Sequence, residues 1–457
     1  MKLGETAMNY NFNHIYFIGI GGISMSALAE IMLEEGIKVS GSDRSDSKII
    51  RKLQTSGAKI YLNHDSKHIS IDIDLVVYTS AISDDNPELI RAKELNIEIM
   101  DRAEFLGFVM KNYKNAICVS GTHGKTTTTG MLSSVLIETD LAPTIFLGGE
   151  MDSLGGNLLH GSYELLLTES CEYKRNFLKF NPTMEVVLNI EEDHLDYYKD
   201  LNDIESAFVE YADKLPPDGY LVVNESYRHL FDNVKCNIVT FGLDKGAYYA
   251  RNIKLVPEPS YTLMHGDEEI AEIKLKVYGE HNILNSLAAA AASLTLGIEP
   301  ETVVKGLFNF KGTHRRFEYK GKLKGANVFD DYAHHPSEMK ATLKTARSYN
   351  DGRIITVFQP HTYTRTIKLL DGFAEALSMS DEVILVDIYA AREINTGVIH
   401  SKDIINKMKN YSKDAIYAGS FREAADIVRS MAKKGDIIIT MGAGNVVDIA
   451  DMLIADR

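Results

Sequence analysis

The stretch GTHGKTTTTG, residues 121–130, decides how the middle of this chain folds. It follows the apolar run NAICVSG and leads into KTTTTGMLSSVLIE, so the pattern predicts a buried strand, a glycine-containing loop and a helix. Backbone N–H groups at the start of such a helix bind phosphate oxygens. Only Thr122 and His123 separate Gly121 from Gly124, which is a shorter spacing than the usual nucleotide loop has. The stretch still predicts a nucleotide phosphate site.

The residues after the second glycine have side chains suited to a nucleoside triphosphate. Lys125 can reach the β- and γ-phosphates, and the Thr126 hydroxyl can coordinate Mg²⁺. A strand–turn–helix junction that is rich in threonine by chance is the alternative, and the order of strand, loop and helix favours the phosphate site. Thr127, Thr128 and Thr129 continue the helix, and we expect them to be surface residues.

Strand and helix patterns alternate along most of the chain. HIYFIGI and SMSALAEIMLEEG near the N-terminus, and RIITVFQP and DEVILVDIY after residue 310, are typical of a parallel sheet with crossover helices. Residues 240–277 alternate like strands and predict a small antiparallel sheet, and HNILNSLAAAAASLTLG predicts a helix. We therefore expect three α/β domains: a Rossmann-like domain of residues 1–112, a central P-loop ATPase-type domain of residues 113–312 with a mostly parallel sheet, and a Rossmann-like domain of residues 313–457.

Composition limits the kind of protein that this chain can be. The 49 Lys and Arg residues against 64 Asp and Glu residues give a net charge of −15, which disfavours nucleic acid as the main partner. The three cysteines are widely spaced, which argues against disulfides and fits a reducing cytosol. No apolar run is long enough for a membrane helix, and the first residues do not resemble a signal peptide. These features predict a cytoplasmic protein, and the negative charge does not exclude small anionic substrates, because a local basic pocket can bind them.

A second glycine-rich turn lies near the N-terminus, in GIGGISMSA at residues 19–27. Gly21 and Gly22 follow a strand together with Gly19, Ser24 stands where a dinucleotide fingerprint has its third glycine, and Asp43 ends the next strand. A simple tight turn is the alternative. The helix start together with Asp43 favours a bound diphosphate with a ribose contact, but it does not imply hydride chemistry.

Acidic residues follow two further buried strands. Glu169 follows YELLLT, and the run after MEVVLNI contains Glu191, Glu192, Asp193, His194 and Asp196. Ligand sites lie at the carboxyl ends of parallel strands, so these carboxylates are candidates for holding Mg²⁺ around a triphosphate. His194 is an unusual ligand for so hard an ion, and a solvated loop is the alternative for the whole run.

Amide and cationic side chains form the remaining clusters. His281, Asn282 and Asn285 begin a predicted helix, where the spacing alone favours capping over contact with a purine edge. Arginine binds carboxylate or phosphate in bidentate fashion, so three arginines are candidates for anchoring anions: Arg315, Arg316 and Arg365. The histidines of DDYAHHPSE and FQPHTYTRT either form plain turns or join a site, and their position at strand ends favours a site.

The order of these motifs resembles that of the Mur ligase family of peptidoglycan synthesis. GIGGISM, GTHGKTTT, TESCEY, NIEEDHLD, GEHNILNSLAA, THRRFE, DYAHHPSE and QPHTYTR occur in that order over nearly the whole chain. The short-spaced GTHGKTT is that family's form of the phosphate loop. The GIGGISM start is more similar to the alanine-adding branch than to the sister branch that attaches a preformed peptide to the same sugar nucleotide for wall recycling.

The resemblance implies an ATP-dependent carboxylate–amine ligase with ATP and Mg²⁺ as cofactors. Its substrates would be UDP-N-acetylmuramate and L-alanine, which would be joined through an acyl phosphate with release of ADP and phosphate. Such an enzyme would serve cell-wall synthesis, cell shape and cell division in the cytoplasm. It would act without nucleic acid or membrane, as a monomer or weak homodimer.

The resemblance also carries over site residues, set by set. The ATP set is Gly121, Thr122, His123, Gly124, Lys125, Thr126, Thr127, His281, Asn282, Asn285 and Arg315. The metal ligands would be Thr126, Glu169 and His194. The sugar nucleotide would meet Gly21, Gly22, Asp43 and Ser80. The place where the sugar carboxylate and the amino acid meet would be lined by Tyr332, His334, His361 and Arg365, with Lys125, His334 and Arg365 as catalytic residues.

One position departs from the family pattern, and two other classes of protein compete with this interpretation. Many relatives have an aspartate where Cys171 stands, so the metal or substrate contacts of that aspartate are not carried over. An NAD(P)-dependent oxidoreductase can be argued from Gly19–Gly22 and Asp43, although the phosphate loop speaks against it. A nucleotide-gated binding protein without synthetic chemistry would hydrolyse ATP without needing an amino acid.

Overall fold

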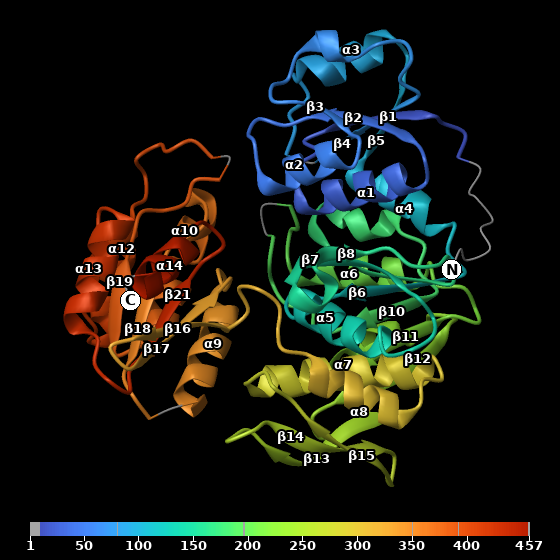
Figure 1. Ribbon diagram of the computed structural model, residues 1–457. Helices are drawn as coiled ribbons and strands as arrows, with labels where there is room; N and C mark the ends of the chain where they lie inside the picture. The colour runs from blue at the N-terminus through green and yellow to red at the C-terminus, as the bar shows by residue number, and fades with distance from the viewer. Residues whose placement is uncertain (1–9, 80, 195–196, 350, 392, 456–457) are drawn as a thin grey trace. The chain divides into compact units, whose positions relative to one another are not determined.

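The structure is a computed structural model that describes residues 10–79, 81–194, 197–349, 351–391 and 393–455. Its strands form three sheets, each accompanied by helices, which confirms the expected three-domain α/β fold (Figure 1). By its internal contacts the chain divides into two compact units. One unit runs to residue 249 and includes residues 265–268 and 287–306; the other contains residues 250–264, 269–286 and the chain from residue 307 onward.

The first sheet is parallel throughout, in the order β3-β2-β1-β4-β5 (blue in Figure 1). Its central strand β1 is buried at every residue, as expected for a parallel strand covered on both faces. The strand order reverses between β1 and β4, and ligand crevices form at the carboxyl ends of such strands. The strands are β1 (His14–Ile18), β2 (Lys38–Ser42), β3 (Lys59–Tyr61), β4 (Leu75–Tyr78) and β5 (Glu98–Asp101), and the helices are α1 (Ile23–Glu34), α2 (Lys48–Thr55), α3 (Pro87–Glu94) and α4 (Arg102–Met110).

The second sheet has ten strands in the order β15-β14-β13-β12-β11-β10-β6-β9-β7-β8. It is parallel from β13 to β7, and β8 at one edge is antiparallel. The strands are β6 (Asn115–Ser120), β7 (Thr144–Met151), β8 (Gly156–Leu159), β9 (Leu165–Glu169), β10 (Met184–Val187), β11 (Tyr220–Asn224), β12 (Asn237–Gly242), β13 (Tyr248–Lys254), β14 (Ser260–His265) and β15 (Glu268–Lys274). The helices are α5 (Lys125–Leu136), α6 (Leu201–Ala212), α7 (Glu280–Thr295) and α8 (Pro300–Asn309).

Residues 240–277 form strands, as expected, but not a separate small sheet. These strands extend the second sheet, and the pair of β12 with β13 is parallel rather than antiparallel. The helix predicted after them is confirmed. Helix α7 begins one residue before the predicted start and ends just before Gly297, whose φ of 81° suits a glycine after a helix.

The third sheet has the order β16-β17-β21-β18-β19-β20. Only the pair of β16 with β17 is antiparallel. Successive residues of one strand enter separate hydrophobic clusters, as with Val328 and Phe329, so both faces of the sheet are covered. The strands are β16 (Glu318–Leu323), β17 (Ala326–Asp331), β18 (Ile354–Phe358), β19 (Glu382–Leu385), β20 (Ile416–Tyr417) and β21 (Ile437–Met441), and the helices are α9 (Pro336–Tyr349), α10 (Tyr363–Lys368), α11 (Leu370–Leu377), α12 (Ser401–Met408), α13 (Phe421–Met431) and α14 (Val447–Ala455).

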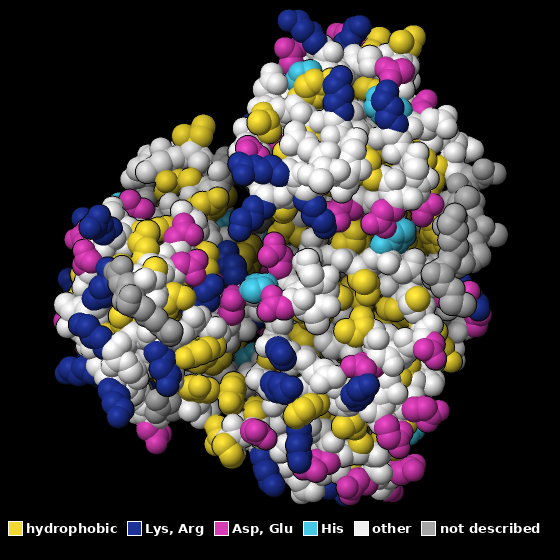
Figure 2. Space-filling view, viewed as in Figure 1, with side chains coloured by type: hydrophobic (Ala, Val, Ile, Leu, Met, Phe, Trp, Pro, Cys, Tyr) yellow, Lys and Arg dark blue, Asp and Glu magenta, His cyan; other side chains and the backbone are white. Residues whose placement is uncertain are grey.

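The surface is charged and of mixed sign. On the face seen in Figure 2, Lys and Arg side chains are interspersed with Asp and Glu side chains. Within the described ranges, no helix combines the length and the apolar character that crossing a membrane requires.

Candidate active site

The predicted phosphate loop lies between β6 and α5, at the carboxyl edge of the second sheet. Gly121 has φ 135° and Gly124 has φ 86°, backbone conformations that side chains rarely allow. Asn189, just after β10, holds the short loop from the side, because its Oδ1 accepts the His123 N–H at 2.7 Å and its Nδ2 donates to the His123 carbonyl at 3.0 Å. Gly124 has no side chain that could cap α5, so the first N–H groups of this helix point to a place where phosphate oxygens can bind.

Lys125 lies inside this loop and carries a positive charge. Its Nζ donates to the carbonyls of Gly121 and Thr122 and lies 3.1 Å from Oε2 of Glu172, a residue that is almost fully buried. Burial, the largest single effect, would lower the pKa of Lys125, but its acidic neighbours, with Glu172 the strongest, together outweigh burial and raise it. Sequence reasoning gave Glu172 no role, although it stands three residues after Glu169 in the same TESCEY run.

The predicted metal ligands fall into two neighbouring groups. The Thr126 hydroxyl donates to Oε2 of Glu169 at 2.9 Å, so these two side chains present oxygen atoms at one point, as Mg²⁺ prefers. His194 lies instead beside Glu172, with Nε2 3.9 Å from its Oε1, and its ring packs against Tyr173. Among the residues that the structure describes, no three His, Cys, Asp or Glu side chains come together as a metal site. The donors therefore fit a magnesium ion that keeps waters and phosphate oxygens as its other ligands.

The expectation of surface threonines in α5 is wrong for two of the three residues. Thr128 and Thr129 are fully buried, and Thr127 is half-buried. Helix α5 packs against β6, β7 and β9, and α8 approaches its C-terminal half so closely that a Cβ on Gly306 would lie 2.4 Å from the Cα of Val135. Helix α5 is thus enclosed between the sheet and a second helix.

Cys171, the position that departs from the family pattern, holds a neutral thiol. Burial and the charge of Glu172 raise its pKa to about 11, although Lys125 acts in the opposite direction. Mg²⁺ prefers hard oxygen ligands and sulfur is a soft ligand, so this side chain is a poor replacement for an aspartate at a magnesium site.

At the glycine-rich turn of the first sheet, three residues predicted to meet the sugar nucleotide lie together: Gly21, Gly22 and Asp43. The Gly21 N–H donates to Oδ2 of Asp43 at 2.9 Å, and a Cβ on Gly21 would lie at the same distance from that oxygen. Gly22 stands directly before α1 and leaves the start of this helix open. Ser80 lies outside the described residues; Thr79 before it follows β4 and contacts the turn at Gly19. The arrangement suits a diphosphate at the carboxyl ends of β1 and β4.

The two amides at the start of α7 bond within their own turn. Asn282 Nδ2 donates to the carbonyl of Tyr278 at 2.7 Å, and Asn285 Nδ2 donates to Oδ1 of Asn282 at 3.1 Å. An N-cap accepts a backbone N–H instead, so these bonds are not the capping bonds that the spacing favoured. Both side chains are buried.

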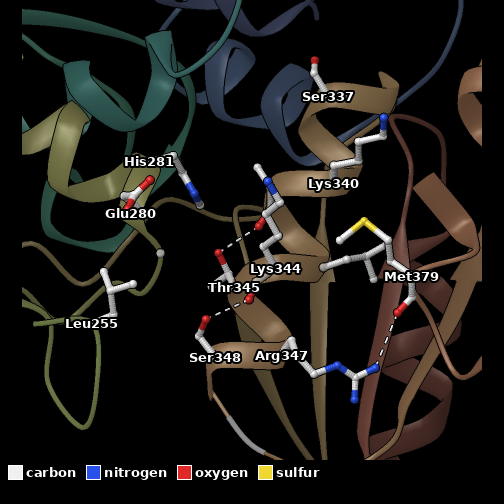
Figure 3. A pocket seen from close by; sticks show the side chains of 13 residues that line it. Leu255, Glu280, His281, Ser337, Lys340, Lys344, Thr345, Arg347, Ser348 and Met379 are labelled. Carbon is white, nitrogen blue, oxygen red and sulfur yellow. Dashed lines mark hydrogen bonds between the residues drawn. The ribbon is translucent and has the colours of Figure 1, made fainter. Parts of the chain in front are cut away.

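His281, next to these amides, faces a cavity of ≈ 730 Å³ (Figure 3). Helix α9 contributes Lys340 and Lys344 to the cavity wall, and Leu255 lies on the side of His281. The surrounding protein and the charge of Arg316 lower the pKa of His281 to about 4, so its ring is neutral at pH 7. A neutral imidazole has one N–H donor and one acceptor, as contact with a purine edge requires.

Four predicted residues meet at the carboxyl edge of the third sheet. Nδ1 of His334 donates to the Tyr332 carbonyl at 3.0 Å, the ring centroids of His334 and His361 lie 5.8 Å apart, and Arg365 donates to Nδ1 of His361 at 3.4 Å. Burial lowers the pKa of His334, and Arg365 adds to this effect while Glu338 opposes it. A neutral His334 can accept a proton at neutral pH.

Arg315 is anchored at the same edge. Its Nε lies 3.1 Å from Oδ2 of Asp330, its Nη2 donates to the Gly442 carbonyl at 2.6 Å, and its guanidinium stands 4.9 Å from the Tyr332 ring. Its φ of 62° is unusual for a residue with a side chain. The structure thus groups Arg315 with Tyr332, and the phosphate loop belongs to the other compact unit.

The structure has a phosphate loop with a partly buried lysine, an open helix start at another sheet, and a histidine–arginine cluster at the third sheet. Together these features are typical of a nucleotide-dependent enzyme with several substrates. Comparison with known proteins agrees. Residues 14–114 match the profile of the Mur ligase family, catalytic domain; residues 119–293 match the Mur ligase middle domain; and residues 315–444 match the Mur ligase, glutamate ligase domain. The chain belongs to the Mur ligase family, and it is an ATP-dependent ligase.

Similar proteins include alanine ligases over nearly their full length. A UDP-N-acetylmuramate–L-alanine ligase of Acetivibrio thermocellus is 50% identical over 98% of this chain and 96% of that protein. One from Clostridium novyi is 46% identical over 98% of this chain and 99% of that protein. The crystal structure of a UDP-N-acetylmuramate–alanine ligase from Thermotoga maritima has a TM-score of 0.82 at 32% identity, covering 97% of this chain and 98% of that one. Membership of a ligase family leaves the oxidoreductase alternative without support.

Proposed function

We propose that this enzyme joins L-alanine to the carboxylate of UDP-N-acetylmuramate at the expense of ATP, releasing ADP and phosphate, in the synthesis of peptidoglycan precursors. The observation that carries the proposal is the 46–50% identity, over nearly the whole chain, to proteins that carry this name. The phosphate loop with the Lys125–Glu172 pair supports the use of ATP. The proposal includes a cytoplasmic location and domains of residues 1–112, 113–312 and 313–457.

The proposed chemistry explains why a phosphate site is needed. A carboxylate is a poor electrophile, and transfer of the γ-phosphoryl group to it gives an acyl phosphate with a good leaving group. The amine of alanine then adds to the acyl carbon, and the tetrahedral intermediate collapses to the amide with loss of phosphate. The protein supplies mainly positioning and charge neutralisation.

Residues of the first unit would hold the two nucleotides. Lys125 and the N–H groups of residues 121–127 would bind the triphosphate, and the side chains of Thr126, Glu169 and His194 would hold Mg²⁺. The metal ion, when bound, neutralises charge on the phosphates. Gly21, Gly22, Asp43 and Ser80 would bind the diphosphate and ribose of the sugar nucleotide.

Residues of the second unit would hold the adenine and the reacting groups. His281, Asn282 and Asn285 would contact the base, with Arg315 near the nucleotide. Tyr332, His361 and Arg365 would surround the carboxylates of the sugar and the amino acid. His334, whose lowered pKa keeps it neutral, would take the proton that the amine loses before attack.

The direct test is ADP release from purified protein with Mg-ATP, UDP-N-acetylmuramate and single amino acids or a tripeptide. We expect release to require the sugar nucleotide and to be greatest with L-alanine. A preference for the tripeptide would identify a peptide-adding ligase. Release that ignores both substrates would contradict the roles given to the third sheet.

A further inference from the structure

A glutamate from a distant loop caps the short helix that carries Arg365. Helix α10 begins at Tyr363, and Thr362 before it has φ 65° and makes no capping bond with its own hydroxyl within the described residues. Glu393 accepts the N–H of Tyr363 at 2.6 Å and the N–H of Thr364 at 3.0 Å, and the Thr364 hydroxyl donates to it as well. A carboxylate from outside the helix thus satisfies the N–H groups of its first turn.

The loop that carries Glu393 is joined to His361 too. The Tyr389 N–H donates to the carbonyl of Pro360 at 2.8 Å, and the Thr362 N–H donates to the Tyr389 carbonyl at 2.9 Å. These bonds form a parallel bridge between His361 and Tyr389, whose rings stack with centroids 5.7 Å apart. One loop, between β19 and α12, therefore fixes both His361 and the helix that follows it.

Glu393 is an anion beside His361. Partial burial would raise its pKa, but the hydrogen bonds from Thr364 and Tyr363 and the neighbouring His361 outweigh burial, so the pKa lies below the ordinary value for glutamate. Its two oxygens already accept three donors. Glu393 thus acts as the acceptor for the first turn of the helix that carries Arg365.

We propose that Glu393 is a positioning residue of the amino-acid site. By capping α10 next to the strained Thr362, it makes His361 and Arg365 face one space. This inference rests on the proposed function, in which these two side chains surround the reacting carboxylates.

The test compares Glu393→Ala and Glu393→Gln with the wild type, using ADP release with each of the three substrates varied in turn. We expect Glu393→Ala to raise KM for L-alanine about fivefold to tenfold, the effect of losing a cap of ordinary strength, while KM for ATP and for the sugar nucleotide stays unchanged. Glu393→Gln keeps an acceptor oxygen and should restore most of the KM.

A matched control is Asp426→Asn, which removes an exposed carboxylate that pairs with Arg429 within α13 and should behave as the wild type. A wild type whose ADP release ignores L-alanine would refute the proposed function and this inference with it. With an alanine-dependent wild type, an unchanged KM in Glu393→Ala, or equal losses for all three substrates that follow a lower Tm, overturns the positioning role alone. If Glu393→Ala does not fold, Glu393→Asp, whose shorter side chain reaches the two N–H groups less well, is measured in its place, and a KM for L-alanine equal to that of the wild type overturns the inference.

Discussion

At the scale of single residues, the proposed nucleotide site contains an ion pair in which each side chain compensates the charge of the other. Lys125 and Glu172 are both withdrawn from water, and Nζ and Oε2 lie 3.1 Å apart. Removing one member of a buried pair leaves an uncompensated charge, at a cost of about 3–5 kcal/mol. A substitution of Lys125 therefore changes both phosphate binding and stability, and an experiment has to separate the two.

We expect Lys125→Ala to abolish ADP formation and to leave binding of the sugar nucleotide largely intact. The loss in kcat should be roughly 10²-fold or more, as for other groups that neutralise developing charge. ADP release and sugar-nucleotide titration measure the two effects. The double variant Lys125→Ala/Glu172→Gln removes the stranded charge, so it should recover Tm without recovering activity. Normal turnover in Lys125→Ala would contradict the phosphate-loop assignment.

A second prediction concerns Glu185 in the middle of β10. Its Oε1 accepts the Ser120 hydroxyl at 3.0 Å, and its Oε2 has no hydrogen-bond partner among the described residues. Burial raises its pKa well above 4.5, so the folded state binds a proton that the unfolded chain releases first. The stability that this proton provides is present at pH 4 and is lost as pH rises above 4.5 toward the folded-state pKa.

Glu185→Gln stays neutral at every pH, so it should gain stability over the wild type as pH rises from 4 to 8. Urea unfolding at several pH values measures the difference. Glu98→Gln, on the exposed side of β5, is the matched control and should show no such trend. A difference between Glu185→Gln and the wild type that does not change with pH would contradict the neutral buried acid.

At the scale of elements, sequence patterns predict features that depend on neighbouring residues and miss features that depend on contacts between distant segments. The strand, loop and helix around Gly121 are neighbours in sequence, so their order alone predicts the phosphate site. Thr128 and Thr129 are buried in a helix that packs against β7 and β9, strands that follow it in the sequence. The pairing of Lys125 with Glu172 and the cap from Glu393 join distant segments in the same way. Such contacts leave no periodic signal near the residues that they affect.

The close contact of α8 with α5 gives a prediction at this scale. In an open helix, Gly306→Ala would stabilise by about 1 kcal/mol through helix propensity. Here the added Cβ would meet the backbone, 2.4 Å from the Cα of Val135 and 2.8 Å from the Ser134 carbonyl. Overpacking of this kind costs about 1–3 kcal/mol, so we expect net destabilisation and a lower Tm.

The control for Gly306→Ala is Gly419→Ala, where the nearest atom would be the end of the Glu423 side chain at 3.5 Å. Calorimetry or urea unfolding compares the two variants. A Gly306→Ala protein as stable as the control would show that α8 can shift away from α5 without loss.

At the scale of the whole molecule, the proposed sugar-nucleotide and ATP sites lie on different sheets. A substitution in one site should therefore abolish binding there and leave binding at the other site intact. Saturating ligand at about 100 times Kd stabilises a protein by about 2.7 kcal/mol. We expect Asp43→Ala, which loses the partner of the Gly21 N–H, to lose the rise in Tm caused by UDP-N-acetylmuramate and to keep the rise caused by Mg-ADP. Lys125→Ala should show the reverse. Loss of both responses in Asp43→Ala would contradict separate sites.

Asn189 has a consequence for how the enzyme handles its phosphates. Since this residue brackets His123 with two hydrogen bonds, the short loop takes its shape from the strand beside it. The segment after β10 continues from Asn189 to Glu191 and His194, and the Glu191 N–H donates to the hydroxyl of Thr122 in the loop at 2.9 Å. The loop proposed to bind the triphosphate and the segment proposed to hold its metal ion are therefore joined by hydrogen bonds, so a displacement of one moves the other.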